Sequence, residues 1–182
     1  MLDNLHRIIK SKEDYFHFID SDKRSQKWEH TLFSLWLDDV WRFQRLMRKL
    51  EYLTNCSRGQ FRRRLCALRY HRLKVRLGFS IPINTFGPGL SIAHYGSIIV
   101  NKFASIGSNC RIHSGVNIGS SRDSDDAAPI IGDNCYLGPG AKVFGKIILG
   151  NNIIVGANAV VNQSFPDGNA TLVGVPARPV TK

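Results

Sequence analysis

Residues 130–162 read IIGDNCYLGPGAKVFGKIILGNNIIVGANAVVN, and aliphatic side chains return in this stretch at every sixth residue. The series is Ile131, Leu137, Val143, Leu149, Val155 and Val161. A second series of mostly small residues stands four positions after these aliphatics: Cys135, Ala141, Ile147, Ile153 and Ala159. A period of six fits neither the α-helix nor the simple alternation of a strand. The stretch therefore predicts a repeated unit of one short strand and one turn.

The same repeat continues upstream of this stretch. Its earlier large apolar positions are Phe86, Ile92, Val100, Ile106, Ile112 and Ile118. Three six-residue units close one triangular coil, with the large aliphatics stacked inside and small residues at the corners. Glycine or asparagine after the aliphatic suits turn conformations with positive φ, which β-branched residues resist. We therefore predict a β-solenoid over residues 78–182.

The register of the repeat breaks at two places. It slips by two residues after Ile92, and the sequence SSRDSDDAAP at 120–129 predicts a loop outside the coil because it supplies no core positions. If the first slip is a local bulge, Ile112 lies directly over Ile92. His94 and His113 then lie on adjacent coils of one face, about 5 Å apart along the axis by the spacing of strands. Breaks in a regular solenoid often build sites, so we interpret the pair as catalytic; the alternative for His113 is a packed turn residue.

The first 77 residues predict a helical region that precedes the solenoid. Apolar residues at steps of three and four predict one amphipathic helix that ends between Asn55 and Gly59. Its members are Leu32, Trp36, Val40, Phe43, Met47, Leu50 and Leu53. A second helix is predicted from about Phe61 to Leu77, with the basic residues Arg62, Arg63, Arg64, Arg69, Arg72, Lys74 and Arg76. Its basic face is either solvated and packed on a neighbouring subunit, or a contact with a membrane or a lipid-linked substrate.

The formal net charge of +11 is concentrated in one part of the chain. No Asp or Glu occurs between Glu51 and Asp123, whereas this stretch carries eleven Lys and Arg. Such a field fits an anionic substrate or cofactor, or a membrane surface, while nucleic acid ranks last because no aromatic-rich recognition motif accompanies the charge. The sequence shows no signal peptide, no membrane-spanning run, no C-x-x-C pair and no zinc spacing among its four cysteines. We expect a cytoplasmic protein with free thiols and no metal.

Five stretches of the repeat region carry a family resemblance. They read GLSIAHYGSIIVN, HSGVNIG, APIIGDNCYLGPGAKVFG, GNNIIVGANAVV and GVPARPV. These motifs are similar to those of the serine acetyltransferase branch of the hexapeptide-repeat acyltransferases, and most similar to members associated with capsule and exopolysaccharide synthesis. The resemblance implies a left-handed parallel β-helix, an exception to the usual right-handed crossover. It also implies a homotrimer that uses acetyl-CoA as co-substrate.

The resemblance also implies roles for individual residues. His94 is the general base that takes the proton from the acceptor hydroxyl, a task that suits a neutral imidazole at pH 7. The oxyanion donor is a backbone N–H in the turn of Gly119 and Ser120. Lys142 and Arg178 are expected to pair with the phosphates of the nucleotide. The full set implied to contact acetyl-CoA is Gly138, Pro139, Lys142, Ala157, Ala159 and Arg178.

Two positions depart from the serine-specific pattern of that family. Where the pattern has an aspartate that orients the catalytic histidine, this chain offers Ser80, and where it has a histidine before the proline that ends the loop, this chain has Ala128. We expect His113 to replace one of these functions as a second base or an acceptor contact, or else Asp125 or Asp126 to reach in from the loop.

We therefore predict acetyl transfer from acetyl-CoA to a hydroxyl of a sugar in envelope polysaccharide synthesis, with L-serine as the alternative acceptor. Two functions of other classes compete with this prediction. A β-helix hydratase of the carbonic anhydrase type needs three converging histidines around a metal, and the repeat region has only two. A purely structural solenoid predicts that His94→Ala leaves every measured property unchanged.

Overall fold

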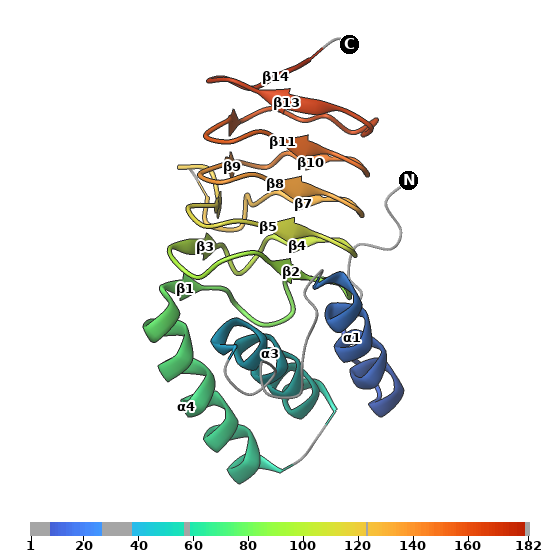
Figure 1. Ribbon diagram of the computed structural model, residues 1–182, viewed down its shortest axis with the longest axis vertical. Helices are drawn as coiled ribbons and strands as arrows, with labels where there is room; N and C mark the ends of the chain where they lie inside the picture. The colour runs from blue at the N-terminus through green and yellow to red at the C-terminus, as the bar shows by residue number, and fades with distance from the viewer. Residues whose placement is uncertain (1–7, 27–37, 57–58, 123, 181–182) are drawn as a thin grey trace.

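A computed structural model describes residues 8–26, 38–56, 59–122 and 124–180. Short strands stack into a three-sided prism, and helices gather at its N-terminal end (Figure 1). The helices are α1 (Lys12–Ser25), α3 (Asp39–Asn55) and α4 (Gln60–Leu77). The fold is the predicted left-handed parallel β-helix of hexapeptide repeats with an N-terminal helical segment.

Three sheets form the sides of the prism, and we name them A, B and C. Sheet A contains, in spatial order, β1 (Phe79–Ser80), β3 (Ile98–Val100), β6 (Asn117–Gly119), β9 (Lys142–Phe144) and β12 (Val160–Val161). Sheet B contains β4 (Ser105–Ile106), β7 (Ile130–Ile131) and β10 (Ile148–Leu149). Sheet C contains β2 (Ser91–Ile92), β5 (Arg111–Ile112), β8 (Tyr136–Leu137), β11 (Ile154–Val155), β13 (Thr171–Val173) and β14 (Arg178–Pro179). The described pairs are parallel except β13 with β14, which is antiparallel.

The residues of the six-residue period form the core of the prism. Both inward series are buried, including Ile131, Leu137, Val143, Leu149, Val155 and Val161, and the smaller Cys135, Ala141, Ile153 and Ala159. Ile92 pairs directly with Ile112, so the register predicted across the first slip is confirmed. The hydrophobic effect therefore fixes the register, because a shift by one residue turns these side chains to the solvent.

The corners of the prism use glycine and asparagine for different reasons. Positive φ is found at Asn134, Asn152 and Asn158, three residues after the inward aliphatic, and not at the glycine directly after it, so that detail of the prediction was wrong. The glycine is needed because successive coils approach closely. A Cβ atom on Gly132, for example, would lie 2.4 Å from Oδ1 of Asn151. The asparagines supply the left-handed turn, and the glycines leave room for the next coil.

The predicted loop at 120–129 leaves the coil for fewer residues than expected. The described residues between Gly119 and Ile130 form no strand, and a hydrogen bond of 3.0 Å from the Ser121 N–H to the Ala127 carbonyl oxygen joins the two ends of the loop. Ala128, however, is buried and belongs to the core. The chain therefore returns to the coil before Pro129, because a small apolar residue at 128 fits the inside of the corner.

The helical region ends where the first strand begins. Gly78 terminates α4 in the left-handed conformation with φ 74°, and its N–H donates to the carbonyl oxygen of Val75. Helix α3 ends at Asn55, close to the predicted end, whereas Leu32 and Trp36 of the predicted stripe lie outside the described residues. Within the described ranges, no helix combines the length and the apolarity needed to cross a membrane.

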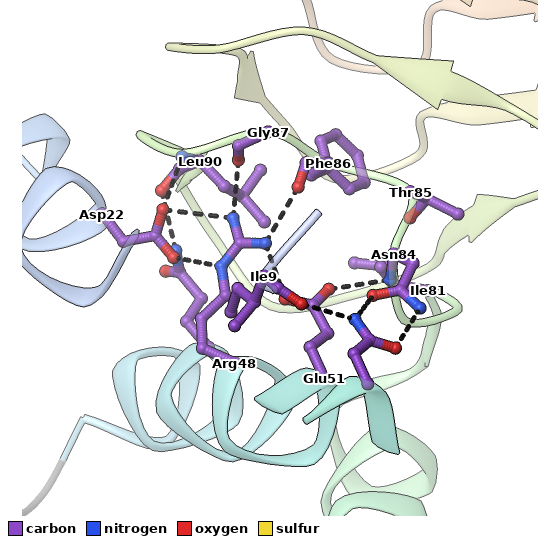
Figure 2. A network of polar contacts seen from close by, with 12 residues as sticks. Ile9, Asp22, Arg48, Glu51, Ile81, Asn84, Thr85, Phe86, Gly87 and Leu90 are labelled. Carbon is purple, nitrogen blue, oxygen red and sulfur yellow. Dashed lines mark hydrogen bonds and ion pairs between the residues drawn. The ribbon is translucent and has the colours of Figure 1, made fainter. Parts of the chain in front are cut away.

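A buried ion network joins the helices to the first coil (Figure 2). The guanidinium of Arg48 donates twice to the carboxylate of Asp22, at 2.8 and 3.2 Å, and once to Glu51, at 3.0 Å. It also donates to the carbonyl oxygens of Phe86, at 2.9 Å, and Gly87, at 2.7 Å. A guanidinium has five N–H donors, and these five bonds use them all. Although burial disfavours its charge, the two carboxylates raise the pKa of Arg48 above the ordinary value.

The two carboxylates of this network hold backbone as well as Arg48. Asp22 Oδ1 accepts hydrogen bonds from the N–H groups of Gly89 and Leu90, at 2.8 and 2.9 Å, and Glu51 Oε1 accepts one from the N–H of Asn84, at 2.8 Å. The segment from 84 to 90 leads directly into β2, the strand that precedes His94. Helices α1 and α3 therefore fix the position of the first coil through buried charge as well as through apolar contact.

Candidate active site

Sheet C turns into sheet A at a corner that carries both predicted histidines. His94 follows β2 and His113 follows β5, and these strands pair on adjacent coils. The two ring centroids are 6.0 Å apart, with the ring planes at 59°. His94 is exposed and His113 is half-buried. The two rings thus lie together as the register predicts.

The exposure of His94 comes from a bulge in its own corner. Ile92 pairs with Ile112 and Ile99 pairs with Asn117, yet six residues lie between the first members of these pairs and four between the second, so the first corner is longer by two. The extra length cannot stay in the stack, so it projects from the prism. Tyr95, next to His94, is 74% exposed for the same reason.

The ring of His113 is partly enclosed by the neighbouring coil, whereas the ring of His94 is exposed to solvent. Its ring lies against Tyr136 of β8, with centroids 5.1 Å apart, and its Nε2 atom is buried without a hydrogen bond to any described residue. Burial, then the charge of Arg111 and the proximity of His94, lower the pKa of His113. His113 is therefore neutral at pH 7, and its Nε2 atom does not face an acceptor. This geometry favours a role in packing and orienting His94 over the predicted role of second base.

A groove of about 480 Å³ runs over the outer face of sheet A beside this corner. Its lining residues are Ile99, Val100, Asn101, Asn117, Ile118, Gly119, Ser120, Lys142, Phe144 and Val160. Lys142 is half-buried in it, and its Nζ atom donates to the carbonyl oxygen of Gly115 at 2.5 Å. The groove therefore combines an apolar wall with one cation held in place by the neighbouring coil.

The predicted oxyanion turn lies within this groove. The carbonyl oxygen of Gly119 accepts a hydrogen bond from the N–H of Gly145 at 3.1 Å, so this part of the turn is fixed to the next coil. The N–H of Ser120 makes no hydrogen bond to any other described residue. A backbone N–H that lines a groove and is not used by the fold can stabilise a developing negative charge.

The carboxylates and the hydroxyl predicted to assist His94 do not contact it. The Asp125 carbonyl oxygen accepts a hydrogen bond from Nδ2 of Asn101 at 3.2 Å, and Asp126 pairs with the Ser124 hydroxyl inside the loop. Ser80 is exposed on sheet A, where it pairs with Ile99 at the edge of the groove. Among the described residues, none makes a hydrogen bond to the imidazole of His94.

The residues predicted to contact acetyl-CoA separate into two groups. Pro139 and Ala157 are exposed on the corner of the two histidines, on the next two coils, because β5, β8 and β11 stack in register. Gly138 stands beside them but is buried, and Arg178 is exposed on β14 at the far end of the prism. Ala159, by contrast, is 1% exposed and packs inside the core. Its methyl group therefore cannot line a groove.

The remaining polar residues of the repeat region include side chains of the types that bind metal ions or act as nucleophiles. Among the residues that the structure describes, no three His, Cys, Asp or Glu side chains converge as ligands of a metal ion. Cys110 and Cys135 are free thiols inside the prism, where burial raises the pKa of Cys135 to about 11. A protonated, buried thiol is neither a nucleophile nor a ligand.

Several residues of this surface were not singled out from the sequence. Tyr136 contacts His113, and Ile99, Asn117 and Phe144 line the groove. Ile99, Asn117 and Tyr136 each stand directly before an inward aliphatic, a position that faces outward in a strand. Reading these outward positions across the coils is the signal that finds them, once the register between coils is known.

The amino-acid sequence of this chain is similar to those of hexapeptide-repeat transferases. The family model described as Bacterial transferase hexapeptide (six repeats) matches residues 128–163. A serine acetyltransferase of Synechococcus elongatus is 34% identical over 110 residues, which are 59% of this chain and 45% of the relative. The chain spans about half the length of the curated relatives it matches.

Solved structures give the same result over more of the chain. The soybean serine acetyltransferase apoenzyme superposes with a TM-score of 0.75 at 27% identity, covering 93% of this chain and 70% of that one. A serine acetyltransferase from Brucella abortus, solved in complex with coenzyme A, superposes with a TM-score of 0.73 at 26% identity, covering 94% and 69%. The likeness includes the helical segment, and the chain is serine acetyltransferase-like in its hexapeptide-repeat architecture.

Proposed function

We propose that this chain is an acetyl-CoA-dependent O-acetyltransferase in which His94 is the general base. The observation that supports it most directly is the exposed imidazole of His94 at the corner where sheet A begins, together with the groove on that sheet, which contains Lys142 and, at the far end of β6, Ser120. An exposed base can activate the acceptor hydroxyl, an unused backbone N–H can stabilise the oxyanion, and a fixed cation can hold an anionic co-substrate. The similarity to serine acetyltransferases, one of them solved with coenzyme A, supports the same reaction.

The reaction that fits these groups is direct transfer without an acyl-enzyme. The neutral imidazole of His94 takes the proton of the acceptor hydroxyl as its oxygen attacks the thioester carbonyl carbon. The carbonyl oxygen becomes an oxyanion, which the N–H of Ser120 stabilises. When the tetrahedral intermediate collapses, the C–S bond breaks, and the sulfur of coenzyme A receives the proton from the imidazolium.

The remaining groups of the groove suit the co-substrate. The ammonium of Lys142 donates one of its three N–H groups to the carbonyl oxygen of Gly115, so two remain to donate to a phosphate or carbonyl oxygen. Pro139 and Ala157, exposed on the same corner as His94, present little side-chain bulk to a pantetheine arm. Arg178 is the candidate for a nucleotide phosphate because a guanidinium fork matches phosphate oxygens. Ala159 is withdrawn from this set.

L-serine is the acceptor that the comparisons favour. The relatives and structures described above are serine acetyltransferases, and none of these names supports a polysaccharide substrate. A sugar hydroxyl is kept as the second candidate on the strength of two residues. Ser80 stands where the serine-specific pattern has the aspartate that orients the base, and Ala128 stands where it has a histidine that contacts the amino acid, so both groups of that pattern are absent.

The assembly that completes this site is proposed to be a homotrimer. The groove on sheet A is open and flanked by apolar residues, with Ile99 44% exposed and Phe144 39% exposed. A second protomer packed against sheet A would cover these side chains and enclose the co-substrate, which strengthens the electrostatic interactions with the oxyanion. Light scattering of the purified protein should give three times the mass of one chain; a monomer contradicts this assembly.

The test of the function is release of coenzyme A, measured with a thiol reagent, with L-serine and with simple sugars as acceptors. We expect turnover with one acceptor class and a decrease of at least about 100-fold in kcat/KM for His94→Ala, as is typical for loss of a general base. His17→Ala is the matched control, because His17 is exposed on α1, outside the corner and the groove. His94→Ala with more than a third of the original rate would refute the proposed role of His94.

A further inference from the structure

Helix α4 presents two apolar stripes, and among the described residues one of them is covered and the other is exposed. The covered stripe consists of Cys66, Tyr70, Leu73 and Leu77. The other consists of Phe61, Leu65, Leu68 and Val75, which are 80%, 42%, 46% and 69% exposed. At 3.6 residues per turn the centres of the two stripes are separated by about 150° around the helix. Most of the second stripe therefore faces away from α3 and the prism, while Leu65 stands at its edge nearest α3.

The exposed stripe is an ordered feature of the helix. Its members follow one another at helical steps of four, three and seven residues, with Arg72 filling the position between Leu68 and Val75. Scattered exposed apolar residues are ordinary on a protein surface, but a continuous row indicates an interaction site. Figure 1 shows α4 at the outer edge of the helical region, with α3 between it and α1.

The positive charge of α4 indicates that its partner is negatively charged. The helix carries Arg62, Arg63, Arg64, Arg69, Arg72, Lys74 and Arg76 and contains no Asp or Glu. Arg76 pairs with Asp39 of α3 at 3.0 Å, and among the described residues this is the one ion pair made by α4. Most of these cations are therefore available to an anionic partner.

A groove of about 430 Å³ beside the exposed stripe has the same amphipathic character. It lies between α3 and α4 and is lined by Tyr15, Leu46, Lys49, Tyr52, Leu53, Arg62, Leu65, Cys66 and Arg69. Leu65 belongs to both the stripe and the groove. Most of the lining is apolar or aromatic, and its three cations, Lys49, Arg62 and Arg69, are all unpaired within the described residues. Such a groove fits a ligand with an acyl chain and an anionic headgroup.

We propose that the outer face of α4, defined by Phe61, Leu65, Leu68, Arg72 and Val75, binds the surface of an anionic phospholipid bilayer. Apolar side chains flanked by arginines are typical of helices that lie in a membrane interface, where the apolar row enters the acyl boundary and the cations pair with headgroup phosphates. A second copy of this chain fits less well. A symmetric contact between two α4 helices brings like charges together without a carboxylate on either helix.

The experiment is cosedimentation of the full-length protein with vesicles. We expect binding to vesicles of phosphatidylcholine with about a third phosphatidylglycerol, at least about tenfold weaker binding to phosphatidylcholine alone, and loss of binding as NaCl is raised. Phe61→Ser with Val75→Ser should weaken binding at least about tenfold without unfolding, because these two side chains have the greatest exposure of the stripe.

A matched pair of charge variants separates this face from general basicity. The triple variant Arg62→Gln, Arg69→Gln and Arg72→Gln should abolish sedimentation with anionic vesicles. The control Lys12→Gln, Lys23→Gln and Lys146→Gln removes the same charge from exposed positions outside α4 and should retain it.

Three results would overturn the proposal. These are equal loss of binding in both triple variants, absence of binding to anionic vesicles at low salt, and a fall in the molar mass of the Phe61→Ser, Val75→Ser variant in light scattering. The last result would assign the face to a contact between copies of this chain. None of these measurements depends on acetyl transfer, so the proposed function can fail without affecting them.

Discussion

Replacement of Arg48 by Met tests how the helical region supports the site. The substitution keeps much of the side-chain volume but removes all five hydrogen bonds that the guanidinium makes, two of them to the carbonyl oxygens of Phe86 and Gly87. Asp22 and Glu51 are left as buried carboxylates without their counter-ion, and both side chains are almost fully enclosed. The variant therefore contains uncompensated buried charge.

The expected loss of stability follows from that burial. Removing one partner of a buried ion pair typically destabilises a protein by about 3–5 kcal/mol. For a chain of this size each kcal/mol shifts Tm by roughly 2–4 °C, so Tm should fall by about 6–20 °C. The triple variant Asp22→Asn, Arg48→Met and Glu51→Gln removes the charges together and should recover part of this loss, because an unpaired charge costs more than an unpaired amide.

The assay is thermal and urea denaturation followed by far-ultraviolet circular dichroism, with acetyl transfer measured on the same samples. Arg24→Met is the control, because the Arg24–Asp20 pair is exposed, with side chains 65% and 57% accessible. Exposed pairs contribute about 0–1 kcal/mol, and this variant should stay within that range. If Arg48→Met also lost less than about 1 kcal/mol, the argument that buried charge fixes the first coil would be refuted.

Three further predictions concern the prism. Lys142→Gln should raise KM for acetyl-CoA about 5- to 30-fold in initial-rate measurements, because it removes a charge-assisted hydrogen bond of about 1–2 kcal/mol. An unchanged KM would show that Lys142 does not bind the co-substrate. Gly138→Ala should lower the free energy of unfolding by about 1–3 kcal/mol in urea titrations, since the added Cβ atom would lie 2.9 Å from the carbonyl oxygen of Val155. An unchanged urea midpoint would show that the two coils can move apart to make room for the methyl group. Burial, together with Arg111, lowers the pKa of His113, so the folded state favours the neutral ring. That contribution is complete above the unfolded pKa of about 6.5, and it is lost as the pH falls from there through the lower folded pKa. Between pH 7 and 5 the unaltered chain should therefore lose more stability than His113→Gln; equal losses would contradict the lowered pKa.

The solenoid could be predicted because one physical cause repeats through it. Each inward aliphatic lies over the next, as Ile112 lies over Ile92, so a periodic sequence has a single way to bury its apolar residues. Helix α1 was not predicted, because it lacks an apolar stripe. Its buried residues are Phe18 and Asp22, and Asp22 holds the helix in place through its ion pair with Arg48. Hydrophobic periodicity cannot reveal a helix that is held by a carboxylate.

The candidate site was predictable where it depends on register and not where it depends on the direction of a side chain. The pairing of β2 with β5 brings His94 and His113 together, and it follows from the repeat once the slip after Ile92 is treated as a local bulge. Ala159 was assigned both to the core and to the co-substrate, and the two assignments are incompatible for one methyl group. The enclosure of His113 by Tyr136 depends on rings from neighbouring coils, which sequence spacing does not describe.

The bulge after β2 explains why a reactive histidine can exist on so regular a fold. In an unbroken repeat every corner stacks on another, and a ring at such a corner lies against the next coil, as His113 lies against Tyr136 with its Nε2 atom buried. A base must reach its substrate, so it needs a corner that leaves the stack without disturbing the strands on either side. Two extra residues achieve this, because β2 and β3 keep their pairing while His94 and Tyr95 move outward. The break in the six-residue period is therefore the feature that exposes the base on an otherwise regular solenoid. It is visible in the sequence as a slip of two residues after Ile92.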